Sequence, residues 1–182
     1  ITLAPNAGIV FQMDGLYVNG GTIGLNIVST NGGRLDRQGY IKNMYFGAQT
    51  DTGLYVNHVG MIGFGMENIN IDGGSTAAYG LRAVTDANTI NSFHDVVLTR
   101  VRVVATNTCG IDIQNDTAGA PQPGAITFVN SIVEANNDFG LCLRGVYALF
   151  INSWWETNGR VGGGPDIQLI SLSPVRTEAH LI

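Results

Sequence analysis

Thr127–Asn136 reads TFVNSIVEAN, and Leu149–Asn158 reads LFINSWWETN. In both segments an aromatic and a β-branched residue precede Asn-Ser. Two apolar residues, a Glu, a small residue and a second Asn follow it. The second segment follows the first after 22 residues. A fixed period of this size is the sequence signature of a repeat architecture. The chain is therefore expected to consist of stacked, equivalent units.

Two markers extend the repeat over the rest of the chain. The first is the Asn that precedes an apolar pair, which recurs with one Asp substitution at Asn19, Asn43, Asn68, Asp95, Asn130 and Asn152. The second is a Gly followed by an apolar residue, at Gly24, Gly53, Gly80, Gly110 and Gly140, with Asp166-Ile167 continuing the series. Between the markers lie short, alternating, β-branched segments without a sustained helical period. Each unit is thus expected to hold three short strands.

The Asn between the second and third strand leaves no room for a loop. It predicts a one-residue corner in the left-handed backbone conformation, which Asn tolerates better than any residue but Gly. Stacked corners would let Asn side chains hydrogen-bond along the axis. We therefore predict an all-β fold, a parallel β-helix with three strands per coil and about six to seven coils, formed by residues 1–182 as one domain. Both ends of the sequence read as strand, and we expect a fragment cut from a longer helix.

Alternation along each strand predicts which side chains point inward. The inward row two residues before the Asn is Tyr17, Ile41, Met66, Phe93, Phe128 and Phe150, and its three Phe side chains are predicted to stack. The outward row of the third strand is Tyr45 and Gly47, Asn70 and Asp72, Val97 and Thr99, Ile132 and Glu134, and Trp154 and Glu156. The outward row of the first strand is Asn26, Tyr55, Arg82, Asp112, Cys142 and Gln168.

Composition excludes several classes of function. Charged residues make up 13% of the chain, the net charge is −5, and no Lys/Arg cluster could neutralise a nucleic-acid backbone. No apolar run reaches the length of a membrane span, and no signal peptide is visible. Cys109 and Cys142 fall three residues out of register, about 10 Å along the strand, which predicts that they do not form a disulfide. We expect no nucleic-acid partner and no membrane insertion.

The coil pattern resembles the pectate-lyase-like right-handed β-helix superfamily. The likeness rests on Gly-Leu/Ile-x-apolar, the corner Asn and Phe-x-Asn-Ser-x-x-Glu-x-Asn, and it covers nearly the whole chain. Within that superfamily the chain looks most like the body of a bacteriophage tailspike or capsule depolymerase. This resemblance implies a right-handed helix, a homotrimer in the phage tail of a virion, and extracellular binding and usually cleavage of bacterial surface polysaccharide.

A shorter match is less informative. Asn107–Ile113 (NTCGIDI) is similar to the Asn-Thr-Asp-Gly-Ile-Asp segment of polygalacturonases, but Cys109 stands where that family has a catalytic Asp. The other catalytic segments of that family are absent, so polygalacturonase activity is not expected.

Glu134 and Glu156 form the first candidate site. Both are predicted to point outward one coil apart, with backbones about 4.8 Å from each other. Retaining glycosidases use two carboxyl groups about 5–5.5 Å apart. Asp72 shares the row two coils back, and Trp154 next to Glu156 would offer a platform for a sugar ring. The pattern predicts Glu134, Glu156 and Asp72 as catalytic candidates and Trp154 as a substrate-binding residue.

Asp112 is the centre of a second candidate site, on the first strand. Arg82 shares its row, Arg144 lies nearby, and Tyr55 and Gln114 add an aromatic ring and a hydrogen-bonding amide. Cationic and polar groups in a groove would suit an acidic polysaccharide. Insertions at 30–37, 86–92 and 116–124 are expected to form one wall of that groove.

Each site has a simpler interpretation. Glu134 and Glu156 can be solvated surface charges, while Trp154, Ile132 and Val97 form an apolar contact with a neighbouring subunit. Asp112 can belong to an ion pair between coils that contributes little at a surface.

Three classes of function therefore stay open: a polysaccharide depolymerase (hydrolase or lyase), a glycan-binding tail-fibre adhesin that does not cleave, and a structural shaft. No cofactor and no metal is predicted for any of them.

Overall fold

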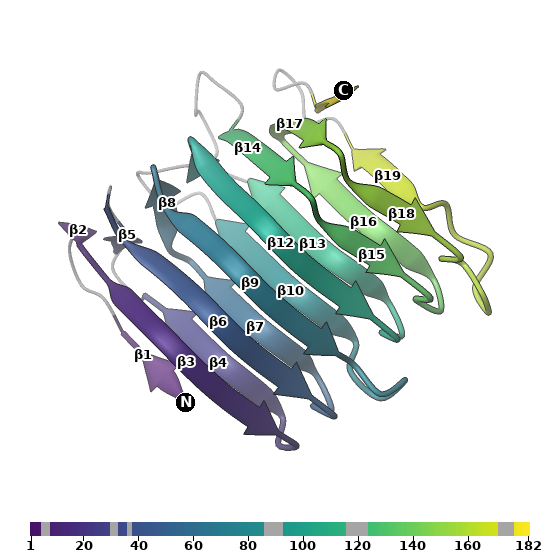
Figure 1. Cartoon of the computed structure of the whole chain (residues 1–182), viewed down its shortest axis with the longest axis horizontal. Coiled ribbons are helices and arrows are strands. Elements are labelled where there is room, and N and C mark those ends of the chain that lie inside the picture. The colour runs from purple at the N-terminus through teal and green to yellow at the C-terminus, as the bar shows by residue number, and fades with distance from the viewer. Residues whose placement is uncertain (5–7, 30–32, 36–37, 86–92, 116–123, 171–176) are drawn as a thin grey trace.

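The computed structural model describes residues 1–4, 8–29, 33–35, 38–85, 93–115, 124–170 and 177–182. Every regular element in these ranges is a β-strand. All strand pairs are parallel, and the strand order in space follows the order in the chain. The chain therefore advances by one strand in each sheet per coil, which confirms a parallel β-helix. The two ends of the chain lie at opposite ends of the stack (Figure 1).

Three sheets form the walls. The first sheet contains β1 (Thr2–Leu3), β4 (Ile23–Val28), β7 (Thr52–Asn57), β10 (Tyr79–Thr85), β13 (Cys109–Asn115), β16 (Phe139–Arg144) and β19 (Ile167–Ile170). The long sheet contains β3 (Gln12–Asn19), β6 (Tyr40–Gly47), β9 (Gly65–Asp72), β12 (Val96–Val104), β14 (Gly124–Val129), β15 (Ile132–Glu134), β17 (Val146–Ile151), β18 (Trp154–Glu156) and β20 (Glu178–Leu181). The small sheet contains β2 (Gly8–Ile9), β5 (Arg34–Leu35), β8 (Gly60–Ile62) and β11 (Phe93–His94).

The three sheets differ from the three expected strands in one respect. The expected second and third strands form a single long sheet, whose strands β6, β9 and β12 run through the corner without a break. The small sheet is an additional wall between the first and long sheets. Its strands β2, β5 and β8 come from sequence that was assigned to no strand, whereas Phe93 of β11 was assigned to the second strand. The first and long sheets face each other across the core (Figure 1).

The corner is the predicted left-handed residue. Asn43, Asn68, Asn130 and Asn152 have φ values of 55°, 53°, 51° and 47°. The side chain of Asn68 donates to Asn43 at 2.8 Å, and Asn152 donates to Asn130 at 2.8 Å. Both the one-residue corner and the Asn ladder are confirmed.

Two of the six corner assignments were wrong. Leu16 pairs with Met44, which places Gly15 (φ 74°) rather than Asn19 at the corner of the first coil. Val101 pairs with Ile69, which places Arg100 (φ 52°) rather than Asp95 at the corner of the fourth. Asp95 is also left-handed, with φ 53°, but it lies at a different corner, between β11 and β12.

These two shifts change which side chains are exposed. Tyr17 lies two residues after the true corner and points outward with 71% of its surface exposed, contrary to the prediction that it points inward. In the fourth coil the outward residues after the corner are Arg102 and Val104, which pair with Asn70 and Asp72. Val97 and Thr99 belong to the part of β12 that precedes the corner.

The inward row of the long sheet fills the core. Ile41, Met66, Leu98, Phe128 and Phe150 follow one another in register, and all are buried. The rings of Phe128 and Phe150 stack with centroids 5.0 Å apart, and Trp155 packs edge-on against both, at 5.6 and 4.9 Å.

The predicted stack of three Phe rings is therefore only partly right. Phe93 is buried, but it lies in the small sheet opposite Met61, and Leu98 takes its expected place between Met66 and Phe128.

The predicted absence of a disulfide was wrong. Cys109 on β13 and Cys142 on β16 are joined by a disulfide, with Cα atoms 6.5 Å apart. The expectation assumed three fully extended residues, about 10 Å along the strand, whereas the two Cα atoms are close enough for the bond.

Candidate functional site

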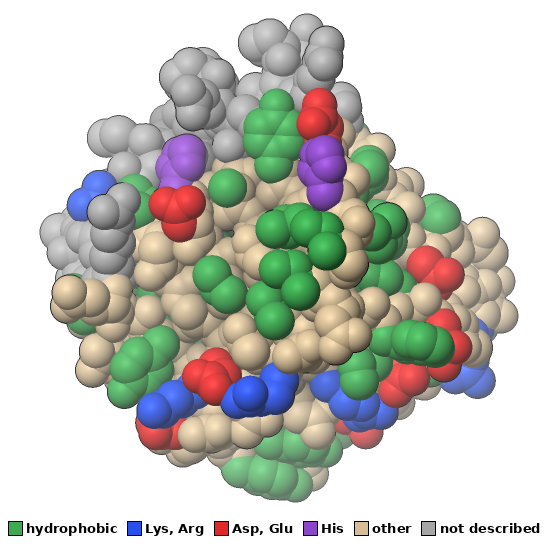
Figure 2. All heavy atoms as spheres, turned by 45° about the horizontal axis from the view of Figure 1, so that its top comes forward, with side chains coloured by type: hydrophobic (Ala, Val, Ile, Leu, Met, Phe, Trp, Pro, Cys, Tyr) green, Lys and Arg blue, Asp and Glu red, His purple; other side chains and the backbone are tan. Residues whose placement is uncertain are grey.

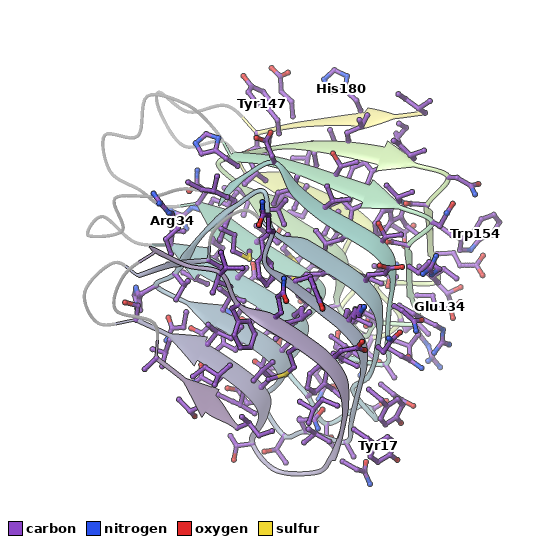
Figure 3. All side chains as sticks on the ribbon, turned by 60° about the vertical axis from the view of Figure 1, so that its left-hand side comes forward. Tyr17, Arg34, Glu134, Tyr147, Trp154 and His180 are labelled. Carbon is purple, nitrogen blue, oxygen red and sulfur yellow. A yellow bond between two sulfur atoms is a disulfide. The ribbon has the colours of Figure 1, made fainter. Side chains whose placement is uncertain are left out.

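Two outward rows follow the corner of the long sheet. The first, here called the aromatic row, is formed by Tyr17, Tyr45, Asn70, Arg102, Ile132 and Trp154. The second, the acidic row, is formed by Asn19, Gly47, Asp72, Val104, Glu134 and Glu156. Because side chains alternate after each corner, every coil contributes one residue to each row. Tyr17, Glu134 and Trp154 lie along the same side of the molecule (Figure 3).

Glu134 and Glu156 occupy adjacent positions, as predicted. β15 pairs with β18 so that Glu134 is opposite Glu156. Glu134 Oε1 accepts a hydrogen bond from Arg102 Nη2 at 2.9 Å, and Glu156 is exposed. One carboxylate of the pair is therefore held by a guanidinium, while the other is open to solvent.

Asp72 lies apart from this pair. Val104, and not Thr99 as expected, separates Asp72 from Glu134 in the row. Asp72 Oδ1 accepts a hydrogen bond from the backbone N–H of Gly74 at 3.0 Å. Asp72 thus holds the turn that follows β9 and is two coils from Glu134.

Trp154 fulfils the geometric condition for a platform. It is the last residue of the aromatic row and is 58% exposed. Because alternate residues of β18 point to the same face, the side chains of Trp154 and Glu156 are neighbours on the outer surface. Ile132 is its neighbour in the row. Val97, which was expected in the same apolar contact, lies before the corner and is not in this row.

Arg102 is the residue of this site that the sequence prediction missed. It was overlooked because the corner of the fourth coil was assigned to Asp95, which removed Arg102 from the outward row. The signal that could have found it is the pattern Arg-Val-Arg-Val at 100–103, which matches Asn68–Ile71 in its apolar positions.

Ion pairs follow both sides of the corner. Asp14 pairs with Lys42 at 3.3 Å, and Glu67 pairs with Arg100. The hydrogen bond from Asn43, with a smaller effect of Lys42, lowers the pKa of Asp14, and Asp14 in turn raises the pKa of Lys42. Together with the pair of Arg102 and Glu134, these two pairs form a series of ion pairs along the corner. Figure 2 shows acidic and basic side chains gathered in a band on one face of the molecule. The ion pairs border the aromatic row with charges of both signs.

Asp112 forms a compact cluster on the first sheet. Arg82 Nε donates to Asp112 Oδ2 at 3.1 Å, and Gln114 Nε2 donates to both carboxylate oxygens, at 3.0 and 2.9 Å. The Arg82 guanidinium lies over the rings of Tyr79 and Tyr55, at 4.4 and 5.5 Å. Burial raises the pKa of Tyr55, although Arg82 acts in the opposite direction. The predicted row from Tyr55 through Arg82 to Asp112 is confirmed.

This cluster is poorly suited to direct catalysis by Asp112. Asp112 is only 3% exposed, and its carboxylate is already bound by Arg82 and Gln114. Arg144 lies beside Gln114 in the next coil, two residues along the strand from the pair of Cys142 and Asp112. The arrangement supports the alternative of an ion pair between coils. The insertions expected to wall this groove lie largely outside the described residues.

No family model, no curated protein and no solved structure matches this chain. In the described part of the chain, no three His, Cys, Asp or Glu side chains are grouped so that they could hold a metal ion. The same ranges contain no helix that is long and apolar enough to cross a membrane.

Proposed function

We propose that this chain is a tailspike-like β-helix of the pectate-lyase-like superfamily, which binds bacterial surface polysaccharide along the aromatic row and cleaves it beside the acidic row. The observation that supports this most is the alignment of exposed aromatic rings, an arginine and two adjacent carboxylates on rigid strands of one face. Sugar-binding sites combine such apolar platforms with a few placed polar groups. The proposed place of action is the virion tail, outside the bacterial cell.

The proposed chemistry is hydrolysis with Glu134 and Glu156 in different roles. Their backbones are one strand spacing apart, about 4.8 Å, which suits the short carboxyl separation of a retaining mechanism. Arg102 holds the carboxylate of Glu134 in place by an ion pair, so Glu134 fits the role of a positioned nucleophile. Glu156 has no partner of this kind among the described residues, and it fits the role of proton donor to the leaving sugar. Trp154 would hold the sugar ring next to Glu156.

A second candidate is binding without cleavage. The ion pair between Arg102 and Glu134 favours it, because a surface carboxylate in such a pair needs no catalytic role. In that case the aromatic row alone would carry the function, as in a tail-fibre adhesin.

The test is to make Glu134→Gln and Glu156→Gln separately and incubate each variant with capsular polysaccharides. Reducing ends are measured for turnover, and polysaccharide binding is measured in parallel. Each variant should lose activity by about a hundredfold or more, since general acid–base and nucleophilic groups contribute at least that much. Glu178→Gln, on β20 and outside both rows, is the control. Unchanged activity in both variants contradicts the catalytic assignment, and binding by a wild type that releases no reducing ends favours the adhesin.

We also propose that copies of this chain associate as a homotrimer, without a nucleic-acid partner and without membrane insertion. An apolar patch before the corner supports association: Val97, Val129, Leu149 and Ile151 lie on the outer face of β12, β14 and β17. Figure 2 shows hydrophobic side chains gathered on this face, above the charged band. Apolar patches of this kind are common at contacts between subunits.

A further inference from the structure

Two tyrosine rings stack at the opposite end of the aromatic row from Trp154. Tyr17 and Tyr45, on β3 and β6, have ring centroids 4.7 Å apart and an interplanar angle of 10°. Tyr17 is largely exposed, yet its ring is held in place by Tyr45. Two aligned rings on neighbouring coils form a rigid platform at the surface.

Gly47 explains how the rings are positioned. A Cβ atom at residue 47 would lie 2.8 Å from both Cε1 and Oη of Tyr45 and 3.0 Å from Asn19 Oδ1. The Tyr45 ring therefore lies over the backbone of Gly47, in space that any side chain would fill. This tilt toward Gly47 draws the ring away from the Asn corner.

A hollow opens between the tilted rings and the corner. It has a volume of about 440 Å³ and is lined by Tyr17, Tyr45, Asn43, Asn68 and Asn70 together with apolar and backbone groups. Its described lining carries no charged side chain. An aromatic wall and a floor of side-chain amides, without a charged side chain, together point to a polar, uncharged ligand.

The hollow lies on the same row of residues as the proposed glycan site. From Tyr45 the same row passes through Asn70, Arg102 and Ile132 to Trp154. Tyr17 and Trp154 are five strand spacings apart, about 24 Å along the axis. One sugar unit of an extended glycan is similar in length to one coil step, so that successive sugars can meet successive coils.

We propose that the hollow is a subsite for an uncharged pyranose ring, and that the glycan extends from it along the helix axis toward Trp154. The tyrosine rings take the apolar face of the sugar, and the amides of Asn68 and Asn70 bond its hydroxyl groups. This inference rests on the proposed function and adds to it a direction of the glycan and the class of sugar at one end.

The first experiment uses single sugars as probes: the methyl glycosides of glucose, galactose and mannose, with glucuronic acid as the acidic counterpart. Binding is measured by saturation-transfer NMR. At least one neutral glycoside should receive transfer, and glucuronic acid should receive less. Tyr17→Ala should reduce the transfer severalfold, whereas Tyr147→Ala, which removes an exposed tyrosine outside both rows, should leave it unchanged (Figure 3).

The contact between the Tyr45 ring and the backbone of Gly47 suggests a second variant. Gly47→Ala should displace the Tyr45 ring and weaken neutral-sugar binding, while a circular dichroism spectrum confirms that the variant is folded. Transfer that is equal in wild type and in both the Tyr17 and Gly47 variants overturns the subsite, as does preference for glucuronic acid or absence of transfer from every neutral glycoside.

Polysaccharide binding separates this inference from the proposed function. If Trp154→Ala weakens binding of a capsular polysaccharide and Tyr17→Ala does not, the glycan does not reach the hollow, and only the inference fails. If neither variant affects binding, the proposed function fails as well. Weaker binding in both variants supports the path along the axis.

Discussion

At the scale of the residue, the corner decides what each coil exposes. The left-handed conformation costs an ordinary L-residue about 1 kcal/mol or more, and Asn and Gly relieve most of that cost. Arg100 occupies the corner at φ 52° between Asn68 and Asn130, where it interrupts the ladder of side-chain amides. The same position carries an exposed ion pair with Glu67, which contributes little to stability.

Arg100→Asn is therefore predicted to stabilise the protein. It should raise the free energy of unfolding by about 0.5–1 kcal/mol and the melting temperature by a few degrees, because Asn suits the conformation and can bond Asn68 and Asn130. Thermal unfolding checks this. Arg102→Asn removes an arginine with ordinary backbone geometry and should give no such gain. A lower melting temperature for Arg100→Asn would contradict the role given to the corner.

The corner also marks the limit of what the sequence could predict. Asn43, Asn68, Asn130 and Asn152 were assigned correctly because Asn is frequent at such positions. Gly15 and Arg100 were missed, since the corner was sought as a recurring Asn and other residues can also adopt its left-handed conformation. The candidate pair Glu134 and Glu156 lay between correct corners, and its geometry could be predicted. Arg102 followed a corner that was wrongly assigned, so its ion pair with Glu134 could not be predicted.

At the scale of the element, the glycines at the start of the first-sheet strands set how closely coils stack. A Cβ atom at Gly110 would lie 2.7 Å from the carbonyl oxygen of Gly140, from Val133 Cγ1 and from Asn136 Nδ2. At Gly53, the corresponding Cβ would lie 2.9 Å from the oxygen of Gly80. The recurring glycines thus form a column in which the backbones of successive coils are too close together for a side chain. This explains why Gly recurs once per coil in the sequence.

Gly110→Ala is predicted to destabilise the protein by about 1–3 kcal/mol, as overpacking of a tight interior does. Chemical denaturation measures the change. Gly65→Ala is the matched control, because the nearest atom to its Cβ would be 3.8 Å away in Tyr40. Equal stability of the two variants would show that the column is not tightly packed.

The elements that were not predicted have physical causes of their own. The small sheet was missed because its strands are only two or three residues long, too short for alternation to be visible. The disulfide was missed because the distance between the two cysteines was derived from fully extended strands, whereas their Cα atoms are 6.5 Å apart. The register of the first sheet was predicted correctly from its glycines, whereas the register of the long sheet was wrong in the first and fourth coils, where the corner residue had been misassigned.

At the scale of the whole molecule, the two halves of the long sheet present different surfaces. The part before the corner is apolar at Val97, Val129, Leu149 and Ile151, and the part after it carries the aromatic and acidic rows. One β-helix can thus offer one face to other copies of the chain and another to a glycan.

The proposed trimer predicts a mass in solution of three chains, measured by light scattering. Val97→Glu places a charge in the apolar patch and should shift the mass toward the monomer, since a buried unpaired charge is unfavourable. Val161→Glu, at an exposed position outside the patch, should leave the mass unchanged. A wild type that is monomeric at all concentrations would contradict the assembly.

The central proposal is that a glycan lies on the aromatic row, and Trp154 is its most exposed residue beside the carboxylate pair. The most direct test is the affinity of wild type, Trp154→Ala and Tyr147→Ala for the capsular polysaccharide that the wild type binds, measured by calorimetry. Loss of a central aromatic contact should weaken binding about tenfold or more in Trp154→Ala. Tyr147→Ala should bind as the wild type does. Equal affinity of Trp154→Ala and wild type would contradict the proposal.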